Sequence, residues 1–140
     1  MLEQLVNTST IDIGSRALAA ASLRHEVLSH NIANVNTPNF RRSHVRFEDL
    51  LKKELGLDDN LLMKVVRTHD RHLPIPFGGK ARAVIEQDAT TNMRVDGNNV
   101  DIDIEMAEVA KNQLYYSALA NAVGGHISKL KSVITSGQGS

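Results

Sequence analysis

Apolar residues alternate at spacings of three and four along residues 10–36, as they do on one face of a long helix. The positions of this heptad pattern are Ile11, Leu18, Ala21, Leu28, Ile32 and Val35, with Gly14 and His25 in the two remaining slots. A second apolar line (Ile13, Ala17, Ala20, Leu23 and Val27) widens the stripe, so we expect two covered surfaces, with helices of other chains on the outer one. Thr10 or Asp12 is expected to cap the start of the helix.

Residues 100–135 repeat this pattern. The stepped positions are Ile102, Val109, Tyr116, Val123 and Leu130, and the adjoining line contains Met106, Ala120, Ile127 and Ile134. Asp101, Asp103 and Glu105 lie in the expected first turn, and Lys129 and Lys131 lie near the end, where the helix dipole favours each charge. The pattern predicts a second long helix that stops before Gly137.

The segment between these two patterns, residues 41–99, is mixed. RFEDLLKKELG predicts a short amphipathic helix that ends at Gly56. LLMKVVR and RAVIE are typical of short strands, and the turn-forming stretch HLPIPFGGK separates them. DGNN at 96–99 predicts a turn before the last helix. A small β element and a loop both fit this segment.

Neither long helix can bury its apolar stripe alone, because isolated helices are marginal in water. The sequence therefore predicts a mainly α fold, in which two long terminal helices form an antiparallel coiled-coil-like hairpin with a small mixed or flexible insertion. The expected divisions are a helix in 1–36, a turn motif and insertion in 37–99, and a helix with its tail in 100–140. The expected seam residues are Leu18, Leu28, Ile32, Val109, Tyr116, Val123 and Leu130.

Composition narrows the classes of function. Lys plus Arg and Asp plus Glu number 16 each, so the neutral chain has no general attraction for nucleic acid or anionic membranes. The absence of cysteine excludes disulfides and thiolate chemistry. The N-terminal stretch lacks the basic and apolar regions of a secretory signal, and we expect no membrane-spanning segment, since no run approaches ~18 apolar residues.

Little in the sequence indicates catalysis. His69, Asp70 and His72 could hold a metal, but Arg67 and Arg71 oppose a cation there and no further ligand is evident. The helix dipole accounts for the carboxylates after residue 100, and no phosphate-binding or dinucleotide motif occurs. We therefore expect no enzyme activity, no cofactor and no metal.

A basic group follows the first helix. Its members are Arg41, Arg42, Arg46, Lys52 and Lys53. A solvated turn face and a contact with an acidic partner both fit this group.

The stretch NIANVNTPNF, residues 31–40, contains more asparagine than a helix end requires. Pro38 disfavours the helical conformation at Thr37, so the helix should end near Asn36. Asn34 and Asn36 suit a C-cap and the following turn. Asn31 lies a full turn earlier, where a buried amide needs a specific partner. The stretch is either a cap alone or a polar corner that fixes the chain against another surface.

The longer stretch SHNIANVNTPNFRR resembles the N-terminal signature of the flagellar axial proteins, the class of rod, hook and hook-associated proteins. The matching residues are Asn31, Ile32, Ala33, Asn34, Thr37, Pro38 and Phe40. His30 and Asn39 depart from the pattern, in which glycine is common at the position of Asn39. Asparagine tolerates positive φ, so the turn should survive. DGNNVDIDIEMAEVAKNQLYYSALANAVGGHISKLKSVI is similar to the C-terminal segment of proximal rod members of this class.

This resemblance implies a structural subunit of the proximal rod of the bacterial flagellar basal body, which helps to connect the inner-membrane ring to the rod. It implies type III export without a cleaved signal peptide and a location on the periplasmic side of the inner membrane. The implied partners are copies of the chain, the rod subunits FlgC, FlgF and FlgG, the adaptor FliE and the ring protein FliF, with neither nucleic acid nor membrane insertion. The alternatives are a FlgC-like sibling or adaptor subunit, or a helical binding module outside the axial structure.

Overall fold

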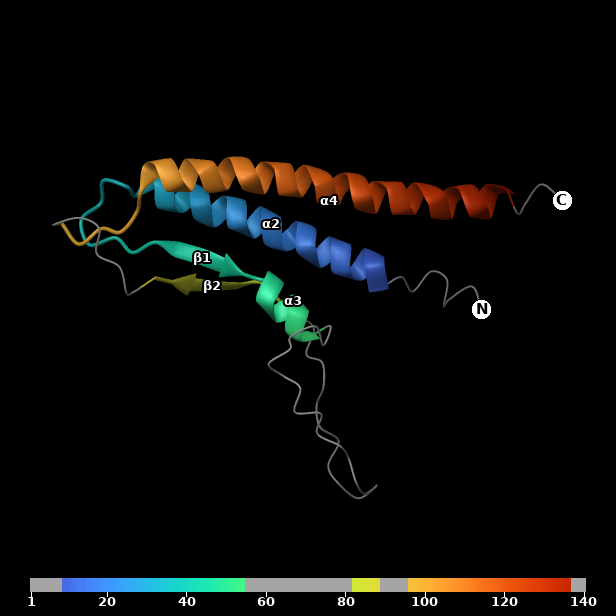
Figure 1. Cartoon of the computed structure of the whole chain (residues 1–140), viewed down its shortest axis with the longest axis horizontal. Helices are drawn as coiled ribbons and strands as arrows, with labels where there is room; N and C mark the ends of the chain where they lie inside the picture. The colour runs from blue at the N-terminus through green and yellow to red at the C-terminus, as the bar shows by residue number, and fades with distance from the viewer. Residues whose placement is uncertain (1–8, 55–81, 89–95, 137–140) are drawn as a thin grey trace, which may run out of the picture.

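Two long helices lie side by side and run in opposite directions (Figure 1). The computed structural model describes residues 9–54, 82–88 and 96–136. In chain order the elements are α2 (Ser9–Ala33), β1 (Ser43–Arg46), α3 (Glu48–Glu54), β2 (Val84–Gln87) and α4 (Ile102–Ser136). The predicted mainly α fold, with two packed long helices and a small insertion, is confirmed. None of the described helices is both long and apolar enough to cross a membrane.

Contacts along the two helices fix their register. Near the start of α2, a Cβ added to Gly14 would lie 2.6 Å from Cγ2 of Val123, so the two backbones approach closely there. In the middle, Nδ2 of Asn112 donates to the backbone carbonyl of Ala21 at 2.9 Å. The small residues that line this side of α2 allow the close approach, because they hold the backbones apart less than larger side chains would.

The second apolar line of α2 is covered by the chain itself. Ala17 and Ala20 form a buried cluster with Phe47, which precedes α3. The side chain of Arg24 donates to both carboxylate oxygens of Glu48 at 2.6 Å and holds α3 against α2. The chain itself therefore covers this surface at Ala17 and Ala20, and the coverage of the rest of the stripe by helices of other chains stays a prediction.

The insertion contains a two-stranded antiparallel sheet. β1 pairs with β2 from Ser43 opposite Gln87 to Arg46 opposite Val84. β2 overlaps the predicted strand RAVIE and ends one residue after it, and α3 lies within the predicted short helix. β1 was not predicted, because SHVR contains a single apolar residue. The stretches LLMKVVR and HLPIPFGGK lie outside the described residues.

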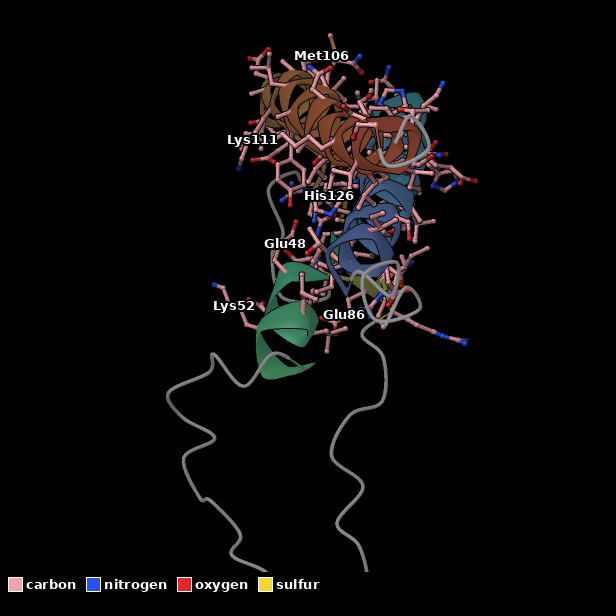
Figure 2. The ribbon with its side chains drawn as sticks, turned by 90° about the vertical axis from the view of Figure 1, so that its right-hand side faces the viewer. Glu48, Lys52, Glu86, Met106, Lys111 and His126 are labelled. Carbon is pink, nitrogen blue, oxygen red and sulfur yellow. The ribbon has the colours of Figure 1, made fainter. Side chains whose placement is uncertain are left out.

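The side of α4 that faces α2 is not the one with the most apolar residues. Its inner line consists of Glu105, Asn112, Leu119 and His126, beside the predicted seam positions Val109, Tyr116, Val123 and Leu130. Of these seam positions, Tyr116 is exposed and the other three are half-buried; on α2, Leu28 is buried, and Leu18 and Ile32 are half-buried. Figure 2 shows His126 on the α2 side of α4 and Met106 on the outside.

The helix ends differ in detail from the expected ones. α2 already includes Thr10 and Asp12, so these residues lie within its first turn rather than at its cap. It ends at Ala33, three residues before Asn36. At the start of α4, Oδ1 of Asp101 accepts the backbone N–H groups of residues 103 and 104 and acts as the N-cap.

Candidate functional site: a polar corner

Asn31 joins three elements from a fully buried position in the last part of α2. Its Nδ2 donates to the carbonyl of Ser43 at 2.8 Å and to Oε2 of Glu105 at 3.0 Å. Its Oδ1 accepts the backbone N–H of Ser43 at 3.0 Å. One side chain thus binds the start of β1 to the first turn of α4. The three partners of Asn31 are fixed in place, because two are backbone groups of Ser43 and the third is the buried carboxylate of Glu105. Only an amide side chain supplies both the donor and the acceptor that these partners require.

Glu105 places a carboxyl group at the centre of the corner, where its side chain has no exposed surface. One oxygen accepts from Asn31, and the other is in ion-pair contact with Nε of Arg42, without the alignment of a hydrogen bond. A buried carboxylate requires such partners, since an uncompensated charge is costly to bury. Glu105 therefore has a structural role that the helix dipole does not explain.

Asn98 clamps the end of α2 from the loop before α4. Its Nδ2 donates to the carbonyls of Asn34, Val35 and Thr37 at 2.9 to 3.1 Å. Its Oδ1 accepts the backbone N–H of Val100 at 2.7 Å. These three carbonyls belong to the turn that follows Ala33. The single buried amide therefore holds that turn against the loop before α4.

The neighbouring Asn99 ties the same loop to the sheet. Its Oδ1 accepts the backbone N–H of Arg42 at 2.6 Å, and its Nδ2 donates to the carbonyl of Asp88 at 3.0 Å. The backbone N–H of Asp88 also donates to the carbonyl of Arg42 at 2.8 Å. The DGNN turn is therefore bonded both to the end of α2 and to the segments that flank β1 and β2.

The turn after α2 interlocks with this loop at Asn39. Asn39 has a φ of 60°, and its N–H donates to the carbonyl of Asp96 at 2.9 Å. Gly97 has a φ of 79°, and a Cβ there would lie 2.8 Å from Oδ1 of Asn39. The expected positive φ at Asn39 is present, and Gly97 is needed both for its conformation and for the space that it leaves.

The other signature residues shape the turn. Asn34 donates through Nδ2 to the carbonyl of His30 at 2.8 Å and accepts from Oγ1 of Thr37 at 3.2 Å. The ring of Phe40 lies against that of His30, with centroids 5.5 Å apart. Ile32 is half-buried, whereas Ala33, Thr37 and Pro38 are exposed. The signature thus has a buried part centred on Asn31 and an exposed part around Pro38.

The described residues hold no group of three or more His, Cys, Asp or Glu that could bind a metal ion. The cluster of His69, Asp70 and His72 lies outside them. A cavity of about 420 Å³ lies among α2, β1 and α4, and a second of about 200 Å³ lies beside His25. Two members of the predicted basic group form ion pairs within the chain. Arg42 pairs with Glu105, and Arg46 pairs with Glu86 at 2.9 Å.

Sequence reasoning found only one side of the corner. It singled out Asn31 and Asn34 but assigned no site role to Asn98, Asn99 or Glu105. A signal was present, since DGNN supplies further amides and belongs to the second stretch that carries the resemblance. The structure brings these two stretches into direct contact although they are more than sixty residues apart.

Comparison with known proteins identifies a family and several relatives that this chain resembles. A family profile described as "Flagella basal body rod protein" matches residues 11–41, from the start of α2 into the turn. The chain is 33% identical over 131 residues to the flagellar basal body rod protein FlgB of Bacillus subtilis (strain 168), covering 94% of this chain and 97% of that protein. It is 30% identical over 139 residues to FlgB of Escherichia coli (strain K12), covering 98% and 99%. FlgB of Borreliella burgdorferi is 33% identical over 130 residues, covering 89% and 95%.

Proposed function

Since the chain belongs to the family of the flagellar basal body rod protein FlgB, we propose that its polar corner sets the shape in which the subunit enters the rod. The protein is a structural subunit of the flagellar basal body rod. The relatives are named as rod proteins rather than as enzymes, and the corner consists of buried polar groups that contact one another rather than an open reactive group.

The direct bonding between the two signature stretches carries this proposal. Asn31 and Asn98 together fix the end of α2 relative to β1 and α4. A buried amide network of this kind favours one arrangement, because any other leaves desolvated polar groups without partners. The corner therefore sets the direction in which the sheet and the insertion leave the helix pair. A repeating assembly needs that direction to be the same in every copy.

Membership of this family supports a finer role, which is also a proposal. We propose that the chain belongs to the proximal part of the rod, where it helps to connect the ring of the inner membrane to the rod. Its neighbours there are copies of itself, the rod subunits FlgC, FlgF and FlgG, the adaptor FliE and the ring protein FliF. It reaches the periplasmic side by export without a cleaved signal peptide. The exposed turn around Pro38 is a surface on which such a neighbour can rest.

The test is a chromosomal Asn34→Ala/Pro38→Ala double variant in the cell that produces the chain. It loosens the turn but leaves the Asn98 clamp in place, because that clamp binds backbone carbonyls. We expect wild-type amounts of exported protein and at least a tenfold loss of assembled rods and motile cells. Asn121→Ala, an exposed change in the middle of α4, is the matched control and should assemble normally. Normal motility of the double variant would reject an assembly role for this turn.

A further inference from the structure

The cavity of about 420 Å³ forms a groove between α4 and the β1–α3 segment, and α2 forms its bottom. Figure 2 shows the two walls of this groove, with Lys111 on α4 and Glu48 on α3. The apolar part of the lining consists of Val27, Leu28 and Val45, whereas the rim is charged. A groove with an apolar bottom and a polar rim suits an apolar side chain of another molecule with a charged group beside it.

Two cations in the lining of the groove have donors to spare. Arg42 contacts Glu105 through Nε, while its Nη1 and Nη2 bond to no other described residue, and its side chain is 30% exposed. The side chain of Lys111 is 75% exposed, and its only ion pair among the described residues is with Glu108 at 3.2 Å, on the same helix. An exposed pair of this kind is weak. Both cations can therefore bind a carboxylate that comes from outside the chain.

The opposite flank of the helix pair carries an apolar side chain and a carboxylate, Met106 and Glu26. Met106 is 55% exposed, and Figure 2 shows Met106 and Lys111 on different sides of α4. At ~100° per residue these two residues lie about 140° apart around α4. Glu26 is exposed, makes no ion pair with another described residue, and lies about 160° around α2 from Arg24, which lines the groove. The Glu26–Met106 flank and the groove thus face in opposite directions.

The groove and this flank lie at the same level of the helix pair. Nδ2 of Asn112 donates to the carbonyl of Ala21, so these two residues mark one level in the two antiparallel helices. Glu26 follows Ala21 by five residues, which corresponds to residue 107 of α4, next to the exposed methionine. Arg42 contacts α4 at Glu105, about 3 Å further along the axis at 1.5 Å per residue.

We propose that neighbouring copies of the chain in the rod lie side by side and in the same direction, with the Glu26–Met106 flank of one copy in the groove of the next. Met106 fills the apolar bottom of the groove, because an unbranched thioether adapts to an irregular space. The carboxylate of Glu26 binds the free nitrogens of Arg42 and the ammonium of Lys111. Because the contact joins opposite faces of the subunit, it continues from copy to copy and generates a ring or a helix.

A second copy fits the groove because one chain carries both halves of the contact. The two halves have complementary charges, face in opposite directions and lie at one level, so copies that point the same way meet without a shift along the axis. The inference rests on the proposed function, since the contact forms between subunits of the assembled rod. It is therefore tested in purified basal bodies, where the presence of the chain and its contacts are read separately.

The first experiment is thiol cross-linking, for which the chain offers a background without cysteine. A tagged chain with Glu26→Cys and Lys111→Cys replaces the wild type in its own cell, and purified basal bodies are treated with a short bis-maleimide. We expect a ladder of covalent multimers of the chain, because each copy is linked to two neighbours. The two single variants are the matched controls and should give no ladder.

The outcomes separate this inference from the proposed function. Basal bodies that contain the double variant but give no ladder, or in which it is linked to another rod protein instead, would overturn the inference alone. Complete basal bodies that lack the wild-type chain would overturn the proposed function and the inference together.

The second experiment changes the two side chains of the flank. Met106→Asp should lower the number of assembled rods by about tenfold or more at wild-type levels of exported chain, because it places a charge in the apolar bottom of the groove. Met106→Leu is the matched control and should assemble normally. Glu26→Lys should also reduce assembly, and adding Lys111→Glu should recover part of the loss. Normal assembly of both Met106→Asp and Glu26→Lys would overturn the inference.

Discussion

A single amide, Asn98, holds the turn that follows the first long helix. It donates to three carbonyls and accepts one N–H, so it is satisfied with no water. The surplus of asparagine after Asn31 pointed to a polar corner, and that part of the site could be predicted. The residues that bond to this part of the site could not be predicted, because Asn98 and Glu105 are distant from it in sequence. Each also has a simpler explanation: Asn98 fits an ordinary turn, and Glu105 fits an acidic residue stabilised by the helix dipole.

Replacing Asn98 with Asp tests the clamp with nearly the same side-chain volume. An ionised carboxylate would face the carbonyls of residues 34, 35 and 37 in a buried site, with the donors lost. We expect the free energy of unfolding to fall by about 3 kcal/mol or more. Urea unfolding of the purified chain measures this, with Asn121→Asp on the exposed side of α4 as the control. Equal stability of the two variants would show that the clamp contributes little.

Glu48 gives the contact between α2 and α3 a pH dependence. Partial burial acts to raise the pKa of Glu48, but the hydrogen bonds and charge of Arg24, with backbone hydrogen bonds, outweigh it and hold the pKa below its usual value of 4.5. A lowered folded-state pKa stabilises the fold above pH 4.5, and this contribution is lost as the pH falls through the folded value.

The expected effect of Glu48→Gln is correspondingly small. At pH 7 it should lower the free energy of unfolding by about 0.2–1 kcal/mol, because the pair is partly exposed. The difference from wild type should shrink as the pH falls below 4.5. Thermal unfolding at a series of pH values measures it, with Glu26→Gln on an exposed part of α2 as the control. A difference that grows in acid would contradict the assignment.

At the scale of elements, the two helices were readable from their periodicity, but the face on which they meet was not. The pattern of α4 contains two adjacent seams that share the Val109–Leu130 line. The outer seam adds the apolar residues Ile102, Met106, Ala120, Ile127 and Ile134, so apolar content predicts that α2 packs there. α2 packs instead on the inner seam, which contains Glu105 and Asn112, each buried beside a specific hydrogen-bond partner. Binary patterning could not identify that choice, because it assigns polar residues to solvent.

Gly14→Ala tests the closest approach of the two helices. The new Cβ would lie 2.6 Å from Cγ2 of Val123, so the helices must shift, and we expect a loss of about 1–3 kcal/mol in the free energy of unfolding. Gly124→Ala is the matched control. It has no neighbour within 4 Å and should stabilise α4 by about 0.5–1 kcal/mol. Adding Val123→Ala to the Gly14 variant should recover much of the loss, and a Gly14 variant as stable as wild type would contradict this packing.

At the scale of the whole molecule, the described part is a helix pair with a polar corner at one end and an uncovered seam on α4 (Figure 1). The repeated heptads predicted a pair of long helices, and the buried core between the described elements is small, with Phe47 as its one aromatic residue. The sequence could not predict β1, because its start is held by the side-chain amides of Asn31, in α2, and Asn99, in the DGNN loop, rather than by an apolar pattern.

The most direct test of the whole account is the location of the chain in its own cell. Hook–basal bodies are purified from cells that carry a tagged copy, then analysed by mass spectrometry and by immunogold labelling. The account predicts co-purification, with label at the base of the rod beside the inner-membrane ring. Complete basal bodies that lack the chain would contradict it, and would leave the polar corner as a device that only ends a helix.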